Sequence, residues 1–209
     1  MRTPIFIYGA GGLGREILSF MNQFEEWELA GFIDDSIPAG TAIKGLKVLG
    51  GPAALPDSDE ELNVVIAAGD PVVKRKMYEA VKTNSRVRFP SLVHPRAILQ
   101  DRASIRIGTG VIITAGCILT TDVRIGNQVL LNLNCTVGHD TVVGDFSSVM
   151  PGVNLAGQVQ IGQGVLIGCG ANVINNIQIA DSCRIGAGAV IIRDVPAGMR
   201  VVGVPGKII

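Results

Sequence analysis

A six-residue spacing of aliphatic side chains runs through the second half of the chain. Every sixth residue from Ile107 to Ile191 is Ile, Leu or Val, which makes fifteen positions in one phase. If about a third of all positions were aliphatic, chance would produce such a run with odds of order 10⁻⁷. Small or β-branched residues stand two positions earlier, as at Val111, Cys117, Val123, Val129 and Cys135. The pattern indicates two inward-facing columns of one repeat.

A period of six matches neither an α-helix nor the plain alternation of a strand. The chain must instead turn a corner every six residues, and three such turns close a triangular coil of about 18 residues. Glycines permit corners with positive φ, and each coil pairs with the next about 4.8 Å away. We therefore expect a parallel β-helix of about five coils over 107–191. Residues 92–106 are expected to add a starting coil, in which Leu99 and Ile105 fit the phase of the small column.

Ahead of this repeat, the chain alternates strand and helix signals. Strands are predicted at 5–8, 29–33, 63–68 and 87–89, and helices over 13–24 and 71–83. Pro90 and Pro95 mark the boundary between these strand and helix signals and the six-residue repeat. The sequence thus predicts an α/β, Rossmann-like half domain over 1–90, followed by a β-helix domain over 91–209.

The first predicted strand leads into a glycine-rich turn, Gly9-Ala10-Gly11-Gly12-Leu13-Gly14, which matches G-x-G-x-x-G. Such a turn brings backbone N–H groups and a helix N-terminus to a phosphate. A dinucleotide fold needs two such halves, so about 90 residues favour a mononucleotide or a nucleotide sugar. A tight turn without a ligand is the alternative. The candidate substrate-binding residues are Gly9, Gly11, Gly12, Leu13, Gly14, the ribose-binding candidates Asp34 and Asp35, and Gly69 with Asp70 at the end of another strand.

Charge and cysteine content narrow the class of protein. Lys plus Arg and Asp plus Glu are both 18, so the net charge is zero, which disfavours nucleic-acid and anionic-membrane partners. No apolar run approaches the roughly 20 residues of a membrane span, and glycines interrupt the apolar N-terminus. Four cysteines without a C-x-x-C pair and only two histidines argue against a metal site. We expect a cytoplasmic protein without a bound metal.

Of the two histidines, His139 is the candidate for chemistry. His94 lies between Val93 and Pro95 at the domain boundary, where a packing role is expected. His139 stands two residues after the inward Val137 and next to Asp140, so it projects outward from the coil. One coil further on, the same position is Gly157.

The order of these features resembles the hexapeptide-repeat sugar acyltransferases. That family is typified by the UDP-N-acetylbacillosamine biosynthesis N-acetyltransferases and the sialic-acid O-acetyltransferases. The resemblance covers nearly the whole chain. It rests on the glycine-rich α/β domain, the coils with Asn132, His139-Asp140 and Leu155-Ala156-Gly157, and the terminal Gly203-Val204-Pro205-Gly206. It implies a left-handed coil and a homotrimer, with acetyl-CoA in the groove between neighbouring coils and the nucleotide sugar in the N-terminal domain.

The resemblance also implies roles for individual residues. His139 would be the general base, Asp140 its acidic support, Asn132 a polar residue lining the site, and the N–H of Gly157 the donor to the oxyanion. Cys169 and Ala187, which are 18 residues apart, would line the pantetheine with their backbone amides, and Lys207, with Arg193 and Arg200, would reach the CoA phosphate. Asp140 can support its neighbour only if a coil corner redirects its side chain.

The expected activity is therefore N-acetylation of a UDP-linked amino sugar in bacterial surface glycan biosynthesis, with direct transfer from acetyl-CoA. Leu13 replaces a histidine that the bacillosamine enzyme carries in its glycine-rich loop, which leaves the acceptor open. Sugar O-acetylation is one alternative, and a non-catalytic nucleotide-sugar-binding trimer is another. A nicotinamide-dependent dehydrogenase is disfavoured by the short first domain.

Overall fold

The computed structural model describes residues 2–57 and 60–209. The chain divides into two compact units, Met1–Pro90 and Ser91–Ile209. No helix within the described ranges is long and apolar enough to cross a membrane.

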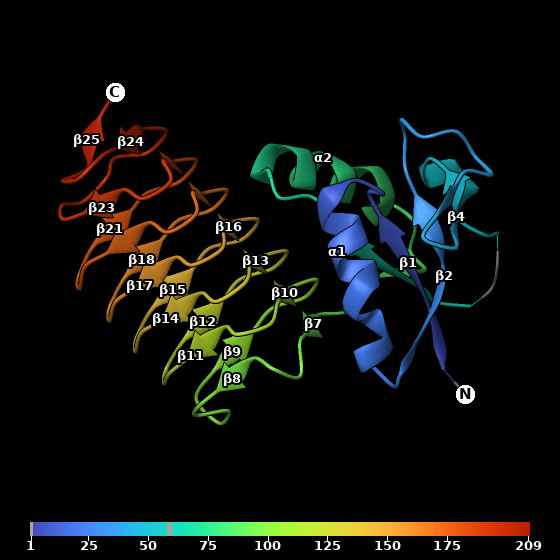
Figure 1. The fold of residues 1–209 in the computed structure, drawn as a ribbon, viewed down its shortest axis with the longest axis horizontal. Coiled ribbons are helices and arrows are strands. Elements are labelled where there is room, and N and C mark those ends of the chain that lie inside the picture. The colour runs from blue at the N-terminus through green and yellow to red at the C-terminus, as the bar shows by residue number, and fades with distance from the viewer. Residues whose placement is uncertain (1, 58–59) are drawn as a thin grey trace. The chain divides into compact units, whose positions relative to one another are not determined.

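The first unit is a six-stranded sheet flanked by two α-helices (Figure 1). Its strand order is β3-β4-β2-β1-β5-β6 among the described residues, and all pairs are parallel except the β3–β4 hairpin. The elements are β1 Thr3–Tyr8, α1 Gly12–Phe20, η1 Met21–Gln23, β2 Trp27–Ile33, β3 Ala42–Ile43, β4 Leu46–Gly50, η2 Pro52–Ala54, β5 Leu62–Ile66, α2 Pro71–Lys82 and β6 Val87–Arg88. Parallel strands joined through helices are the expected α/β arrangement.

The four predicted strands and two predicted helices of this unit are present, within a few residues of the expected bounds. The β3–β4 hairpin was not predicted. Its turn is Lys44-Gly45, and both residues have positive φ, 48° and 85°, as a two-residue hairpin turn requires. Lys-Gly is a weaker turn signal than Asn-Gly, so the hairpin is difficult to predict from these residues.

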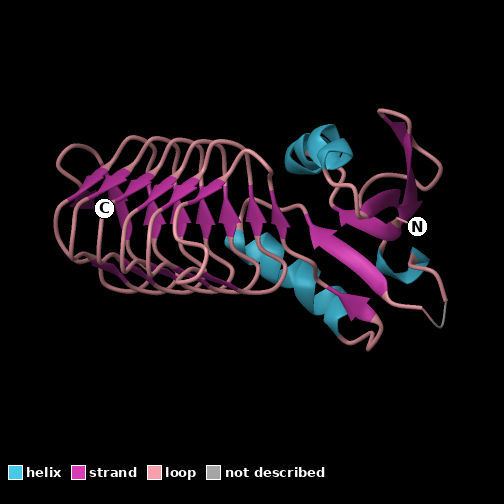
Figure 2. Ribbon diagram, turned by 90° about the horizontal axis from the view of Figure 1, so that it is seen from below, coloured by secondary structure: helices cyan, strands magenta, loops and turns pink. Residues whose placement is uncertain are grey.

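The second unit is a parallel β-helix in which three sheets form the faces of a triangular coil (Figure 2). The first face contains β7 Leu92–Val93, β10 Ile112–Ile113, β13 Leu130–Leu131, β16 Ser148–Val149, β19 Leu166–Ile167, β22 Arg184–Ile185, β24 Arg200–Val202 and β25 Lys207–Ile208. The second contains β8 Ile98–Leu99, β11 Ile118–Leu119, β14 Thr136–Val137, β17 Asn154–Leu155, β20 Asn172–Val173 and β23 Val190–Ile191. The third contains β9 Arg106–Ile107, β12 Arg124–Ile125, β15 Val142–Val143, β18 Gln160–Ile161 and β21 Gln178–Ile179.

Two edges of this left-handed coil carry the candidate site residues. The histidine edge, between the second and third faces, consists of residues 120–122, 138–140, 156–158, 174–176 and 192–194. The cysteine edge, between the first and second faces, consists of residues 114–116, 132–134, 150–152, 168–170 and 186–188. Residues 18 apart on one edge are neighbours in adjacent coils.

The predicted inward columns form the core of the coil. Nearly all of their members are buried, including Cys117, Cys135 and Cys183. The corners use more than glycine, because eight other residues there also have φ between 53° and 62°: Asp122, Gln128, Asn134, Asp140, Phe146, Gln158, Asn176 and Ser182. Asn and Asp tolerate this conformation better than most residues do.

The six-residue period is broken at both ends of the coil. Leu99 pairs with Leu119, twenty residues away, because two extra residues lie between β8 and β9. Leu99 therefore belongs to the large aliphatic column, and its assignment to the small column was wrong. At the other end, Ile185 pairs with Val201, sixteen residues away, and β25 adds an antiparallel strand to β24.

Candidate active site

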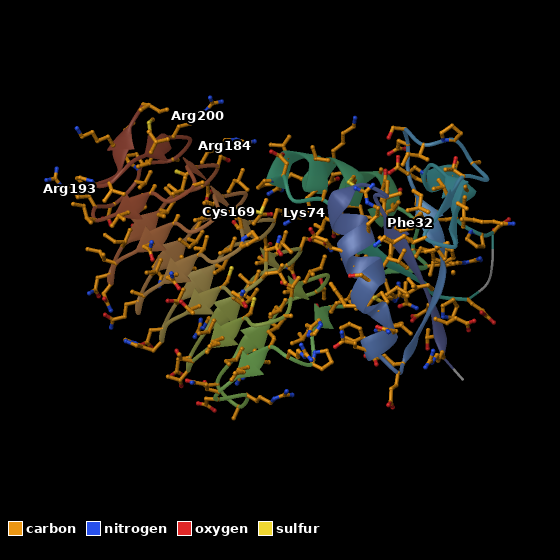
Figure 3. The ribbon with its side chains drawn as sticks, viewed as in Figure 1. Phe32, Lys74, Cys169, Arg184, Arg193 and Arg200 are labelled. Carbon is orange, nitrogen blue, oxygen red and sulfur yellow. The ribbon has the colours of Figure 1, made fainter. Side chains whose placement is uncertain are left out.

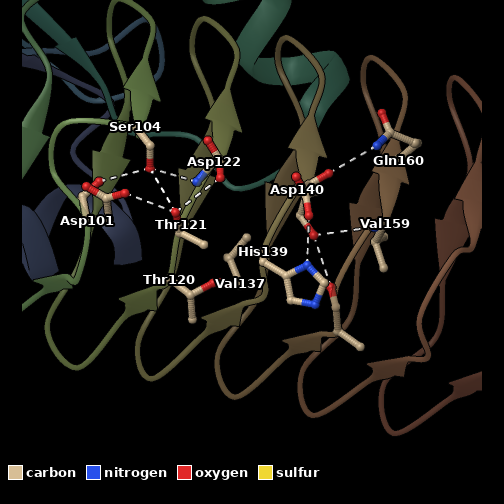
Figure 4. A network of polar contacts seen from close by, with 12 residues as sticks. Asp101, Ser104, Thr120, Thr121, Asp122, Val137, His139, Asp140, Val159 and Gln160 are labelled. Atoms are coloured by element: carbon tan, nitrogen blue, oxygen red, sulfur yellow. Dashed lines mark hydrogen bonds and ion pairs between the residues drawn. The ribbon is translucent and has the colours of Figure 1, made fainter.

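His139 and Asp140 form a hydrogen-bonded pair at the histidine edge, directly after β14 (Figure 4). His139 Nδ1 lies 2.8 Å from Asp140 Oδ2, and each side chain is about half exposed. In an extended strand, adjacent side chains point to opposite faces. Asp140 instead has φ +59°, and this left-handed corner turns its carboxylate back toward the ring. The corner thus supplies the redirection that the proposed support of His139 requires.

The imidazole of His139 occupies the space in front of Gly157, its neighbour in the next coil. A Cβ atom built on Gly157 would lie 2.3 Å from His139 Nε2 and 2.5 Å from Cε1. The Gly157 carbonyl accepts a hydrogen bond from the Asn176 N–H. None of the described residues accepts one from the Gly157 N–H. A ring nitrogen and an available backbone donor therefore share one site.

This geometry fixes the chemical character of the ring. A carboxylate only accepts hydrogen bonds, so the proton between the two groups is on Nδ1 and Nε2 carries the lone pair. Nε2 is the ring atom that lies nearest to the position of the missing Gly157 Cβ. His139 is therefore arranged to accept a proton at Nε2.

The histidine edge continues from Gly157 toward the C-terminus as an apolar strip that ends in positive charge. Ile174 and Ile192 are 44% and 41% exposed on this edge, an unusual position for large aliphatic side chains. Arg193 then follows, and it lines a groove of about 310 Å³ together with Lys207. Arg193 and Arg200 both lie at the C-terminal end of the coil (Figure 3). Sequence reasoning missed the two isoleucines, although a spacing of 18 from Gly138 and Ala156 identifies them.

Asn132, Cys169 and Ala187 lie on the cysteine edge, so within one chain they are on a different edge from His139. Asn132 is buried, and its Oδ1 accepts a hydrogen bond from the Leu133 N–H at 2.8 Å. The Cys169 carbonyl accepts from the Gly188 N–H at 2.8 Å, which links successive coils. The Cys169 side chain is exposed (Figure 3). The structure does not join these residues to His139 by any hydrogen bond among its described residues.

The N-terminal unit contains a pocket of about 630 Å³ at the carboxyl ends of its parallel strands. The predicted Gly9, Asp34, Asp35, Gly69 and Asp70 line it, with Tyr8, Ser36, Ala67, Ala68, Val73, Lys76, Met77 and Ala80. Gly11, Gly12, Leu13 and Gly14 are not part of this lining. Lys76 is a polar lining residue that sequence reasoning missed, and its place on the outer surface of α2 could have suggested it.

The glycines of the turn serve different purposes. Gly9 has φ +104°, and a Cβ on Gly14 would lie 1.9 Å from the Gly9 carbonyl oxygen, so the fold itself requires both. A Cβ on Gly11 or Gly12 would meet nothing within 4 Å. Glycine at these two positions leaves the backbone open to close approach from outside.

Asp34 and Asp35 differ in how much of each carboxylate is free. Asp34 Oδ2 accepts from the Ala10 N–H at 2.8 Å, and Oδ1 accepts from the Ser36 and Ile37 N–H groups and the Ser36 hydroxyl. Partial burial opposes ionisation, but these bonds together lower the pKa of Asp34. Asp35 Oδ2 accepts from the buried Tyr8 hydroxyl at 2.6 Å. Burial and this bond raise the pKa of Tyr8. Asp34 therefore clamps the glycine-rich turn, and Asp35 is the better placed to accept from a ligand.

Two residues near this pocket have mainly local roles. Asp70 caps α2, accepting from the Val72 and Val73 N–H groups. Lys74, in the first turn of α2, is only 2% exposed and does not line the pocket. Burial lowers the pKa of Lys74 to about 7. Lys74 is therefore poorly placed to meet a phosphate there.

A second groove, of about 780 Å³, runs along the third face beside Asp140. Arg106 and Arg124 pair in adjacent coils within it, and Ser104, Asp122, Asp140 and Val142 complete its lining.

His94 is buried, and its Nδ1 accepts from the Arg96 N–H at 3.0 Å. Among the described residues, no three His, Cys, Asp or Glu side chains gather as a metal-binding group.

Known proteins share both parts of this architecture. Residues 4–81 match the PglD N-terminal domain, and residues 158–193 match the bacterial transferase hexapeptide repeats. No curated protein matches the chain. In both of its units the chain resembles the hexapeptide-repeat sugar acyltransferases.

Solved structures match the chain over 99–100% of its length. An asparagine variant of perosamine N-acetyltransferase from Caulobacter crescentus, in complex with CoA and GDP-perosamine, is 27% identical, with a TM-score of 0.90 over 99% of this chain and 96% of that chain. The acetyltransferase domain of PglB from Neisseria gonorrhoeae, in complex with acetyl coenzyme A, is 27% identical, with a TM-score of 0.90 over 100% of both chains. WeeI from Acinetobacter baumannii is 27% identical, with a TM-score of 0.73 over 99% of this chain and 100% of that chain.

Proposed function

We propose that this acyltransferase moves the acetyl group of acetyl-CoA to the amino group of a nucleotide-linked amino sugar, with His139 as general base. The observation that carries the proposal is the His139 ring, held by Asp140 with Nε2 against the backbone of Gly157. The full-length similarity to sugar N-acetyltransferases supports the choice of an amine as acceptor.

The reaction follows from the arrangement at the histidine edge. The amine lone pair attacks the thioester carbonyl carbon, and Nε2 of His139 takes a proton from the amine nitrogen as the C–N bond forms. The Gly157 N–H donates to the oxyanion of the tetrahedral intermediate. When this intermediate collapses, the C–S bond breaks, and the proton on Nε2 passes to the CoA sulfur. Asp140 stabilises the transient imidazolium through Nδ1.

The histidine edge also supplies a path for the acyl donor. Three coils separate His139 from Arg193, about 14 Å at the usual spacing of paired strands. Ala156, Ile174 and Ile192 offer apolar contacts along this path to the pantetheine arm, and Arg193 and Lys207 offer positive charge to the CoA phosphates. Of the residues to which the family resemblance assigns a role with acetyl-CoA, Gly157 and Lys207 therefore fit one continuous donor site within a single chain.

We propose further that this donor site is completed by a neighbouring copy in a homotrimer. Asn132, Cys169 and Ala187 lie on the cysteine edge, so they can serve the site at His139 only from another chain. A groove between the β-helices of two copies would place acetyl-CoA against the histidine edge of one copy and the cysteine edge of the next.

The unit over 1–90 is proposed to hold the nucleotide part of the acceptor, and the unit over 91–209 to carry the transfer chemistry. Asp35 is available to the ribose, the Gly11 and Gly12 backbone is open to phosphate, and Lys76 adds a cation to the pocket. The family resemblance favours a UDP sugar, whereas the Caulobacter crescentus relative holds GDP-perosamine. Both nucleotides therefore belong in the test.

The test is release of free CoA thiol from acetyl-CoA by the full-length protein, with UDP- and GDP-linked 4-amino sugars, UDP-GlcNAc and free sialic acid as acceptors. Mass spectrometry of the product identifies N-acetylation. We expect turnover only with an amino sugar, and a loss of at least about 100-fold in His139→Ala.

Turnover with a hydroxyl acceptor alone would replace N-acetylation by O-acetylation. A His139→Ala variant as active as the wild type would remove His139 from the reaction. The trimer is tested by light scattering, and a monomer with full activity would refute the shared site.

A further inference from the structure

The irregular first coil brings a cluster of polar side chains to the histidine edge, one coil before His139 (Figure 4). The two extra residues between β8 and β9 lie in the segment that carries Asp101 and Ser104. The Thr121 hydroxyl lies 3.0 Å from Asp101 Oδ2, its nearest acceptor, and 3.2 Å from both Asp122 Oδ2 and Ser104 Oγ. Ser104 Oγ also accepts from the Asp122 N–H at 2.8 Å.

These hydrogen bonds hold the side chain of Thr121 from the N-terminal side. Hydrogen bonds to Ser104 and Thr121 lower the pKa of Asp101, so it is ionised at neutral pH. The break in the hexapeptide period therefore places the Asp101 carboxylate beside the Thr121 hydroxyl.

Thr121 connects this cluster to the catalytic pair through the main chain. Its carbonyl accepts from the Asp140 N–H at 3.2 Å. From the following coil, Gln160 Nε2 donates to the Asp140 carbonyl at 3.3 Å. The corner at Asp140, with φ +59°, is therefore held from both sides by neighbouring coils. That corner is what turns the Asp140 carboxylate toward His139 Nδ1.

We propose that Asp101 and Thr121 are positioning residues, which hold the Asp140 corner so that its carboxylate orients the His139 ring. This role rests on the proposed function of His139 as base. The route runs from the Asp101 carboxylate to the Thr121 hydroxyl, from the Thr121 carbonyl to the Asp140 N–H, and from the Asp140 carboxylate to Nδ1. The side chains of Asp101 and Asp140 are exposed, and the side chain of Thr121 is partly exposed. Without these bonds, water would compete for each group and the corner would sample more conformations.

The test compares Thr121→Val and Asp101→Ala with a matched control. Thr109→Val removes a hydroxyl that also bridges two coils, through Asn127 Oδ1 at 3.2 Å, but on the edge between the third and first faces. We expect Thr121→Val and Asp101→Ala to lower kcat by about 2- to 10-fold, the effect of one ordinary hydrogen bond. The KM for acetyl-CoA should stay unchanged, because the donor path lies on the C-terminal side of His139. Thr121→Ser should restore the rate, and Thr109→Val should match the wild type.

A double-mutant comparison separates positioning from a general structural effect. In the His139→Ala background, Thr121→Val should cause no further loss of the residual rate. A crystal structure of Thr121→Val should also show the Nδ1 to Oδ2 contact lengthened from 2.8 Å or the ring in more than one orientation.

Three results would overturn the role: Thr121→Val equal to Thr109→Val, a loss that persists without His139, or an unchanged ring in the crystal. If His139→Ala itself kept full activity, the proposed function would fail first, and this outcome is distinct from the other three.

Discussion

Replacing Gly157 by alanine should separate activity from stability. The added methyl carbon would lie 2.3 Å from His139 Nε2, whereas ordinary contact begins at about 3.5 Å. The ring must therefore move by about 1 Å, and a displacement of that size can cost about 100-fold in rate. The alanine keeps its backbone N–H, so the loss would report the position of the base and not the loss of the oxyanion donor.

Stability should respond in the opposite direction. Gly157 has φ outside the left-handed region, and the same edge position carries Thr121, His139, Asn175 and Arg193 in other coils. An alanine at a compatible glycine position stabilises a protein by about 0.4–1 kcal/mol through the unfolded chain. Because the His139 side chain is half exposed, it can swing away into solvent without opening a cavity.

The assay is kcat for CoA release, paired with urea unfolding of the same preparations. We expect Gly157→Ala to lose about 10- to 100-fold in kcat with an unfolding free energy equal to or above that of the wild type. In the His139→Ala background, the alanine should lower kcat no further, whereas its effect on the unfolding free energy should remain. Wild-type kcat in Gly157→Ala would show that the ring does not work from this position, and a large loss of stability would show that the fold itself requires the glycine.

Three further perturbations follow from burial and charge. Leu131→Ala, at a fully buried position of the coil, should lower the free energy of unfolding by about 2–5 kcal/mol in urea titrations, and a loss below about 1 kcal/mol would contradict its place in the core. Burial lowers the pKa of Lys74 to about 7, whereas a lysine in an unfolded chain has a pKa of about 10.4. Between about pH 7 and about pH 10.4, the unfolded state therefore binds more protons than the folded state, and the free energy of unfolding should rise with pH. Lys74→Met should remove that rise, and an identical slope in both proteins would exclude the buried lysine as its cause. Arg193→Ala should raise the KM for acetyl-CoA by about 10-fold, as expected for a charged hydrogen bond to phosphate, and leave the KM for the sugar unchanged; an equal rise in both would place Arg193 outside the donor path.

Most of the fold was predictable because the core of the coil repeats. The period of six defines the faces, the inward columns and the pairing of residues 18 apart without any tertiary information. Prediction failed where the period changes. The two extra residues between β8 and β9 move Leu99 from one column to the other, and sequence phase alone cannot show on which side of the insertion the register shifts. The β3–β4 hairpin depends on the conformation of Lys44-Gly45, for which the sequence signal was weak.

The site was predictable in part, and the same period explains which part. His139 and Gly157 are 18 apart, so their neighbourhood follows from the repeat. Cys169 lies 30 residues beyond His139, which is not a multiple of 18, and the arithmetic alone places it on another edge. The contact between His139 and Asp140 was expected from the family resemblance alone, because the period does not reveal the left-handed corner on which it depends.

Gly157 differs from other glycines of the coil in what its missing side chain makes room for. A Cβ on Gly138 or Gly144 would lie within 2.6 Å of the backbone of the next coil, so the packing of coils requires glycine there. A Cβ on Gly157 would meet only the imidazole of His139 among its three nearest atoms. The space in front of Gly157 is therefore explained by the ring that occupies it, and this links the glycine to the chemistry of His139 more directly than to the stability of the coil.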